Sequence, residues 1–393
     1  MMKPRNGSQQ SGTFKINQFL SVWGLALAIA LGAILRFWNL DLKPLWMDEA
    51  ITLLFALGHR YEDLPREVLI PLQDWLSVLD WQPQSCAAIA QTVNQQSTHP
   101  PLFFCAMHQW MGWWHQSGME LRWQVRSLSA LAGTAAIAAL YLVNRVAFSH
   151  RAGLWAAGLM AVSPFAVYLS QEGRHYTLPM LIIALSLIPT VQLGTAHTNR
   201  DRLVPLLAWV GLSSLGFYVH YFCLLAFGAE ALALAAVLWR QRSALGVVSL
   251  GIVGIGLSLW PWMPQLLAHT QRPETDWLQF NAALGPSWLE PLLRLLAGCI
   301  VTVVMFPVEN QPLPIVILNG LLMLGFVVYL CATLWRHRRK LFSLSQRPCS
   351  AQVLSYVLLA CVGEYLVLVY GLHKDLTLAF RYNFVFYPVL CAL

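Results

Sequence analysis

The sequence predicts an all-α integral membrane protein, a polytopic bundle of about 9–11 transmembrane helices with surface-lying helices in its first outer loop. Three observations support this class. Hydrophobic residues make up 57% of the 393 positions, and only 11% are charged. The 17 Trp residues and a mean hydropathy of +0.55 exceed what one soluble core can bury. The apolar residues also fall in runs of spanning length with basic loops between them.

A helix that crosses the hydrocarbon needs about 20 apolar residues. The stretch before the first such run carries Lys3, Arg5 and Lys15 and is followed by no clear cleavage site, so the N-terminus is expected in the cytoplasm and the first span is expected to be retained. Two apolar stretches, about 101–117 and 288–308, are ambiguous. The predicted spans run over about 18–38, 123–144, 151–170, 176–196, 203–219, 221–239, 243–263, 312–335 and 352–371.

The basic loops decide how the stretch at 101–117 lies. If it crossed the membrane, the basic residues near 145–151, 200–202 and 240–242 would all lie outside, against the positive-inside rule. Its Trp and His residues suit the headgroup region, so it is predicted to be interfacial or partly re-entrant. The same rule, applied to the basic run 336–340, predicts that 288–308 does not cross fully.

The chain is predicted to form a single domain, 1–393, with an outer loop at 39–122 inserted in it. That loop holds nine of the 18 acidic residues and is therefore well solvated. The apolar run after Arg381 stops at Leu393, too short to span, so we expect a C-terminally truncated chain. Interfacial helices in the loop are indicated by apolar residues at helical spacing, among them Leu53, Leu54, Leu57, Leu69, Leu72, Leu76 and Leu79 with Trp75 and Trp81.

Charge and cysteine usage exclude several function classes. The net charge of +7 comes from loop residues that report membrane orientation, so nucleic-acid binding is not expected. Eight cysteines are present without a Cys-x-x-Cys pair, and most of them fall in apolar segments. The sequence therefore predicts neither a disulfide framework nor a thiolate metal site.

Asp48 and Glu49 form the best catalytic candidate, because a chain with so few charges places them side by side just beyond the first span. A paired carboxylate that faces several arginines is suited to transfer from a lipid-linked phosphate donor: the Asp deprotonates an acceptor hydroxyl, and guanidinium groups hold the leaving phosphate. Under the predicted topology, the same outer surface holds Asp48–Glu49, the turn 98–102 with His99, Arg126, the loop 170–176 with Glu172, Arg174 and Tyr176, and Arg381–Tyr382.

In this order, these motifs resemble the GT-C fold membrane glycosyltransferases that use polyprenyl-phosphate sugars: protein O-mannosyltransferases, aminoarabinose transferases and RgtA-like enzymes. The resemblance implies a GT-C type bundle and an inverting hexosyl- or pentosyltransferase of the plasma membrane, with its site on the outer face. It implies that Asp48 is the general base, that Glu49 supports it, and that Arg174 and Arg381 contact the donor phosphate. His99 would shape the donor pocket, and the expected substrate-binding set also includes Arg126, Glu172, Tyr176 and Tyr382.

Alternatives remain for each motif. The alternative for the acidic pair is a helix cap, for the turn after His99 a rigid entry to a helix, and for the arginines a place as interfacial anchors. A secondary transporter is the rival function, with the intramembrane acids Glu230 and Glu364 as its ion relay. Mg²⁺ or Mn²⁺ would suit the carboxylates, but no further ligand cluster accompanies them, so no metal site or cofactor is assigned. The expected partners are the bilayer, a polyprenyl-phosphate sugar donor and an acceptor that the sequence does not identify.

Overall fold

The computed structural model describes residues 23–64, 71, 77–281, 285–308, 310–343 and 349–393. Within them the chain is almost entirely helical, and its one β interaction is an isolated bridge between Gln279 and Lys374. The residues Leu69, Leu72, Trp75 and Leu76 of the predicted loop helices lie outside the described residues. The predicted all-α membrane fold is confirmed.

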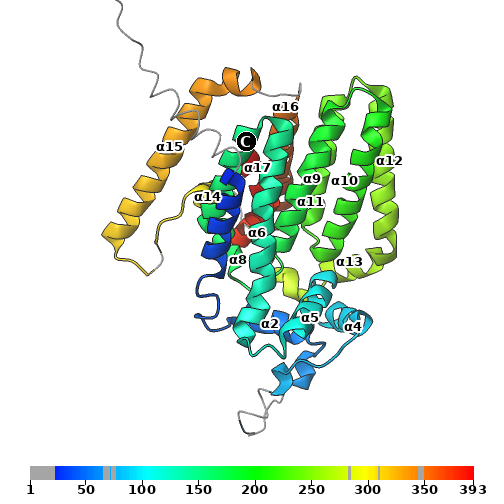
Figure 1. Ribbon diagram of the computed structural model, residues 1–393, viewed down its shortest axis with the longest axis vertical. Helices are drawn as coiled ribbons and strands as arrows, with labels where there is room; N and C mark the ends of the chain where they lie inside the picture. The colour runs from blue at the N-terminus through cyan, green and yellow to red at the C-terminus, as the bar shows by residue number, and fades with distance from the viewer. Residues whose placement is uncertain (1–22, 65–70, 72–76, 282–284, 309, 344–348) are drawn as a thin grey trace, which may run out of the picture.

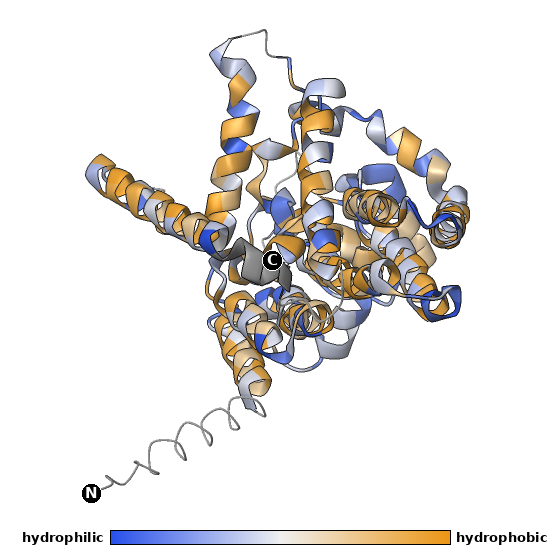
Figure 2. Ribbon diagram, turned by 90° about the horizontal axis from the view of Figure 1, so that it is seen from above, coloured by the Kyte–Doolittle hydropathy of each residue, from blue (hydrophilic) through white to orange (hydrophobic). Residues whose placement is uncertain are grey.

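Seven described helices are long and apolar enough to cross a membrane, or eight if the bent pair α7 and α8 forms one span. Two further apolar helices, Trp23–Phe37 and α11, are shorter. Most long helices lie side by side, and their outward surfaces are largely hydrophobic (Figures 1 and 2). The helices from α6 to α16 are α6 (Leu121–Ala147), α7 (His150–Val162), α8 (Pro164–Ser170), α9 (Thr177–Thr195), α10 (Asn199–Val219), α11 (Cys223–Leu238), α12 (Arg242–Leu259), α13 (Met263–Thr270), α14 (Pro286–Val303), α15 (Leu313–Ser343) and α16 (Ser350–Leu366).

Three short helices gather at one end of this bundle (Figure 1): α2 (Met47–Ala56), α4 (Cys86–Gln96) and α5 (Leu102–Trp114). With 13 residues, α5 is too short to span a bilayer, which agrees with the interfacial placement predicted for 101–117. In contrast, α14 has the length and composition of a span. The segment that the positive-inside rule predicted to stop short is therefore long enough to cross.

The break between α7 and α8 is built from Pro164, which has no N–H to donate to the Met160 carbonyl. The two helices meet at 57°, and the Ser163 hydroxyl caps α8 by accepting a hydrogen bond from the Ala166 N–H at 3.3 Å. The buried Arg36 side chain replaces the missing bonds, donating to the Met160 and Ala161 carbonyls at 2.8 and 2.9 Å. The break therefore bends the chain without leaving the Met160 and Ala161 carbonyls unpaired.

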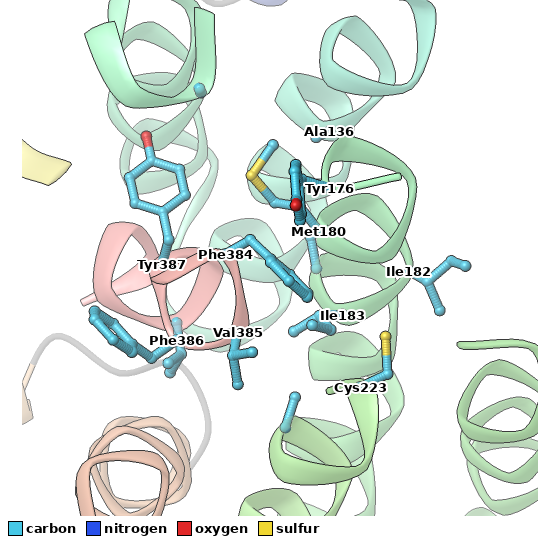
Figure 3. Close-up of a cluster of buried hydrophobic side chains, with 14 of the residues drawn as sticks. Ala136, Tyr176, Met180, Ile182, Ile183, Cys223, Phe384, Val385, Phe386 and Tyr387 are labelled. Atoms are coloured by element: carbon cyan, nitrogen blue, oxygen red, sulfur yellow. The ribbon is translucent and has the colours of Figure 1, made fainter. Parts of the chain in front are cut away.

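The C-terminal segment fills the middle of the bundle. After the 3₁₀ turn Phe380–Val385 comes α17 (Tyr387–Ala392), and Phe384 and Tyr387 are at most 1% exposed. Figure 3 shows the segment from Phe384 to Tyr387 beside Met180 and Ile183 of α9. Because this packing fixes the residues after Phe380, it also fixes Arg381 and Tyr382 at the bundle end.

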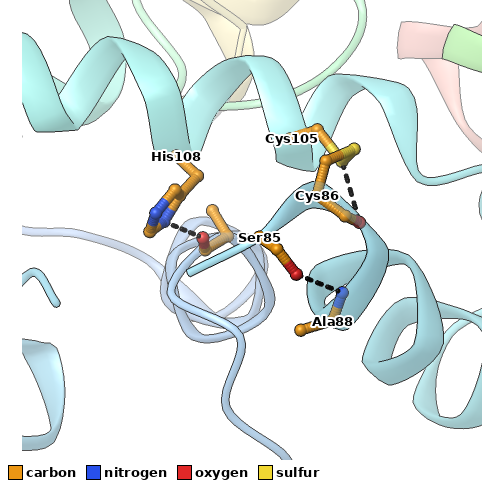
Figure 4. The surroundings of a disulfide bond; sticks show 6 residues. Ser85, Cys86, Ala88, Cys105 and His108 are labelled. Carbon is orange, nitrogen blue, oxygen red and sulfur yellow. Dashed lines mark hydrogen bonds between the residues drawn. A yellow bond between two sulfur atoms is a disulfide. The ribbon is translucent and has the colours of Figure 1, made fainter. Parts of the chain in front are cut away.

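A disulfide joins Cys86 at the start of α4 to Cys105 in α5 (Figure 4). The Ser85 hydroxyl caps α4 by accepting a hydrogen bond from the Ala88 N–H at 3.2 Å. The other six cysteines are free. The prediction of no disulfide framework was thus wrong for this one pair, because partners 19 positions apart are brought together by the turn between two helices that the sequence pattern does not reveal.

Candidate functional site

A cavity of about 360 Å³ opens at the end of the bundle where α2 and α5 lie. Its size falls in the range of small-molecule sites, about 300–1,000 Å³. The lining comes from segments far apart in sequence and includes Asp48, Tyr61, His99, Arg174, Tyr176, His220, Phe222, His269, Glu274, Trp277, Arg381 and Tyr382. Of the residues predicted for the site, Asp48, His99, Arg174, Tyr176, Arg381 and Tyr382 therefore meet at one cavity.

Asp48 lies between two guanidinium groups at the cavity wall. Its Oδ2 is 3.7 Å from Arg174 Nη2 and 3.4 Å from Arg381 Nη2. The side chain is 24% exposed, so it faces the cavity. A carboxylate in this position can accept a proton, and the two cations can bind an anionic group at the same time.

The two arginines differ in how firmly they are held. Arg174 Nη1 donates to the Asp48 carbonyl at 2.8 Å and to Thr52 Oγ1 at 2.6 Å, which ties it to the first two turns of α2. Among the described residues, Nε of Arg174 and Nε of Arg381 have no hydrogen-bond partner. The ring of Tyr176 lies between them, with its centroid 5.6 Å from Arg174 Cζ and 5.8 Å from Arg381 Cζ. Both guanidiniums therefore keep donor capacity beside the cavity.

Glu49 lies away from the cavity, although it is the neighbour of Asp48. Its carboxylate is 0% exposed and accepts two parallel bonds from Arg126, Nε to Oε1 and Nη2 to Oε2, each 2.7 Å long. The Gly173 N–H donates to Oε1 at 2.7 Å, and the Trp46 N–H donates to Oε2 at 3.3 Å. All of its acceptor capacity is used inside the protein.

Arg126 completes this buried unit. It also donates to the carbonyls of Leu40, Lys43 and Pro44 at 2.9 Å each, so it holds the chain that leads into α2. A Cβ at position 173 would lie 2.2 Å from Val125 Cγ1, so only glycine lets the 170–176 loop approach this closely. Arg126 and Glu49 thus clamp α2 against α6 and orient Asp48 without lining the cavity.

Glu172, the other acid of the predicted set, does not line the cavity either. Its carbonyl accepts a hydrogen bond from the Arg174 N–H at 2.8 Å, and burial raises the pKa of its carboxyl group. The Ser129 hydroxyl of α6 donates to the Arg174 carbonyl at 2.9 Å. These bonds fix the loop that presents Arg174.

Three histidines lie together where His99 and His220 line the cavity, and two of the three, His175 and His220, were not in the predicted set. One ligand nitrogen of each lies within 4.8 Å of the other two. His175 and His220 are 1% and 3% exposed. The sequence could have indicated His175 and His220 as site residues, because the predicted topology places all three histidines on outer-face loops.

A divalent cation at Asp48 and Glu49 does not fit this geometry. Both oxygens of Glu49 are occupied by Arg126, and Asp48 faces two guanidiniums at 3.4 and 3.7 Å. Mg²⁺ and Mn²⁺ prefer several oxygen ligands, and this site offers them one carboxylate already surrounded by positive charge. No step of the chemistry is assigned to such an ion.

Inside the bundle, Glu230 has the surroundings of a satisfied structural group. Its carboxylate accepts hydrogen bonds from Ser186 Oγ at 2.6 Å, Thr190 Oγ1 at 2.9 Å and Trp209 Nε1 at 2.7 Å. These bonds join α9, α10 and α11. The rival interpretation as a transporter relay therefore gains no support from Glu230.

The arrangement of bundle, end helices and cavity defines a GT-C type membrane fold, as the sequence predicts. Residues 99–266 match the family model described as dolichyl-phosphate-mannose-protein mannosyltransferase. The chain is similar to the crystal structure of ArnT from Cupriavidus metallidurans bound to undecaprenyl phosphate, with a TM-score of 0.57 and 15% identity over 93% of this chain. This likeness covers 58% of ArnT, so the chain spans little more than half the length of that protein.

A weaker likeness exists to the archaeal oligosaccharyltransferase AglB from Archaeoglobus fulgidus in complex with an inhibitory peptide and a dolichol-phosphate. The TM-score is 0.47, with 14% identity over 96% of this chain and 50% of that one. No curated protein sequence matches the chain. The likeness to ArnT establishes the fold of the chain.

Proposed function

We propose that this protein is a glycosyltransferase that moves a sugar from a polyprenyl-phosphate donor to an acceptor hydroxyl, with Asp48 as general base. The observation that carries the proposal is the Asp48 carboxylate between the Arg174 and Arg381 guanidiniums at a cavity wall. The family match and the undecaprenyl phosphate bound to ArnT support a lipid phosphate as the donor class.

In the proposed reaction, Asp48 takes the proton of the acceptor hydroxyl as its oxygen attacks the anomeric carbon of the sugar. The bond from that carbon to the phosphate oxygen breaks, and the electron pair leaves with the polyprenyl phosphate. Arg174 and Arg381 stabilise the charge that develops on the leaving group. One displacement of this kind inverts the anomeric configuration, and no general acid is needed because the phosphate leaves as an anion.

Glu49 and Arg126 are proposed as positioning residues. Their buried pair orients α2 through the Leu40, Lys43 and Pro44 carbonyls, so they act on the reaction through Asp48. Tyr176 and Tyr382 wall the cavity beside the arginines. Glu172 supports the loop that carries Arg174.

The direct test incubates purified protein in nanodiscs with radiolabelled undecaprenyl-phosphate sugars and a cell-envelope extract that supplies acceptor hydroxyls, and measures the release of undecaprenyl phosphate and the transfer of label to the extract. We expect at least one donor to be consumed by the parent protein, and its turnover to require Asp48. If every donor in the panel stayed intact and undecaprenyl phosphate itself did not bind, the proposal would be wrong.

We further propose that the cavity faces the outer side of the plasma membrane, with the N-terminus in the cytoplasm. The Cys86–Cys105 disulfide at this end supports the orientation, because disulfides persist in oxidising compartments. A cysteine introduced at the exposed residue Gln116, with the six free cysteines replaced, should react with an impermeant thiol reagent in intact cells. Reaction only after permeabilisation would reverse the orientation.

A further inference from the structure

The cluster of His99, His175 and His220 is not used by the proposed proton transfer. His99 and His220 line the cavity, and His175 lies directly behind them. The His175 ring centroid is 4.4 Å from that of His99 and 4.7 Å from that of His220. Three segments far apart in sequence therefore bring their imidazoles to one wall.

The nitrogens of this cluster are short of partners. Among the described residues, both ring nitrogens of His175 and Nε2 of His220 lack a hydrogen-bond partner. Buried polar atoms are normally paired, because an unpaired one loses its bonds to water without replacement. Of these two histidines, His220 lines the cavity, where a hydroxyl group of a ligand can supply the missing bond.

The imidazoles are neutral at physiological pH. Burial, together with the neighbouring Arg174, His269 and Arg381, lowers the pKa of His99 to about 3. Burial and neighbouring positive groups likewise hold the pKa values of His175 and His220 well below the usual range. A neutral imidazole offers one N–H donor and one acceptor nitrogen, which complements a hydroxyl group.

Two features argue against a metal ion in this cluster. The Phe222 N–H donates to His220 Nδ1 at 3.1 Å, so neutral His220 carries its proton on Nε2 and has no lone pair there for a metal. The positive groups Arg174 and Arg381 act on His99, and the cluster includes no carboxylate. A doubly charged cation would be repelled without a compensating anion.

The position of Tyr176 connects the cluster to the phosphate-binding arginines. Its ring lies within 5.8 Å of both guanidinium carbons, and its centroid is 6.1 Å from that of His220. A donor whose phosphate contacts Arg174 and Arg381 can therefore reach His99 and His220 with its sugar inside the same cavity. Phe222 and Tyr382, with centroids 4.8 Å apart, supply apolar ring faces on the same cavity.

We infer that His99 and His220, backed by His175, bind hydroxyl groups of the transferred sugar, and that this sugar is uncharged. The inference rests on the proposed function. The ammonium of an amino sugar would meet neutral imidazoles at the cluster, beside two guanidiniums whose charge the single Asp48 carboxylate offsets only in part. The carboxylate of a uronic acid would be buried against neutral imidazoles while the arginines hold the phosphate. An unpaired buried charge is strongly disfavoured, so the cluster selects against both.

The test measures binding of four lipids to purified protein in nanodiscs: undecaprenyl phosphate alone, and the same lipid carrying mannose, aminoarabinose or galacturonic acid. We expect the mannose lipid to bind more tightly than undecaprenyl phosphate alone. The lipids that carry aminoarabinose or galacturonic acid should bind no more tightly than undecaprenyl phosphate alone. His220→Phe and, separately, His99→Gln should weaken binding of the mannose lipid about tenfold, the value of one lost hydrogen bond. Neither change should alter binding of undecaprenyl phosphate.

The exposed His197 provides the matched control, and His197→Phe should bind all four lipids like the parent. A preference for a charged sugar would overturn the inference and leave the proposed function intact. If both variants weakened binding of the bare lipid phosphate and of the mannose lipid equally, the histidines would have a structural role. If His220→Phe lost one equivalent of metal, the cluster would be a metal site. Either result also overturns the inference. If no lipid phosphate bound to the parent, the proposed function itself would fail.

Discussion

Asp48 and Glu49 are neighbours in the sequence, yet their carboxylates lie in two different regions. Glu49 is fully buried, and Arg126, Gly173 and Trp46 use its oxygens at distances from 2.7 to 3.3 Å. Asp48 faces the cavity, 3.4 Å or more from its two arginines. A carboxylate with every bond made inside the protein stabilises the fold, whereas one with loose bonds at a cavity remains available to a substrate.

The largest effect is expected from Glu49→Gln. Removing this charge leaves Arg126 buried without its counter-ion, which typically costs about 3–5 kcal/mol. The fraction of protein that stays monodisperse after heating in detergent measures the loss. The matched control is Glu120→Gln. The exposed Glu120 pairs with Arg122 at 3.5 Å at the start of α6, the helix that carries Arg126. An exposed ion pair of this kind stabilises the fold by at most about 1 kcal/mol. Equal thermal stability of the two variants would contradict the division between the regions.

Asp48→Asn should have the opposite profile. The amide keeps the size of the side chain and removes its basicity, so transfer should fall by roughly 10²-fold or more while thermal stability stays near that of the parent. Donor turnover and melting temperature measured on one preparation separate the two regions. Full turnover in this variant would exclude Asp48 as the base.

The arginines sharpen the comparison within the cavity. Replacing Arg174 or Arg381 with Lys keeps the charge and loses the two-pronged donor geometry, so undecaprenyl phosphate should bind about tenfold more weakly in each case. Only Arg174→Lys should also lower the melting temperature, since Arg174 alone bonds the Asp48 carbonyl and Thr52. Arg122→Lys serves as the control, and unchanged lipid binding in both cavity variants would reassign the two arginines as anchors.

The smallest effect concerns pH. The pKa of His175 in the folded protein lies well below the usual 6.5, so the unfolded chain binds more protons as the pH falls below about 6.5. Folding stability from this group is therefore complete above that pH and is lost on acidification. His175→Gln should show a smaller drop in melting temperature between pH 7 and pH 5 than the parent, whereas the same change at exposed His197 should leave the drop unaltered. A drop that is identical in all three proteins would show that His175 is protonated in the folded state.

Hydropathy and charge were sufficient for the membrane class, for most helix positions and for the short α5, because these depend on periodicity along the chain. They were also sufficient to bring Asp48, His99, Arg174 and Arg381 to one side. The length of α14 was less well predicted, since the positive-inside rule constrains the loops and not the helix. The Cys86–Cys105 bond was missed because its partners meet only through helix packing.

By itself, the sequence determined which chemical groups stand at one end of the bundle, since a membrane chain can place its few charges only where they are solvated or paired. Only the tertiary structure decided what each group does there. It closed Glu49 onto Arg126 from 77 positions away, left Asp48 open to the cavity, and gathered His99, His175 and His220 at one wall. These outcomes depend on which donors reach which acceptors across the packed helices. The order of residues along the chain does not give the distances between those groups in space.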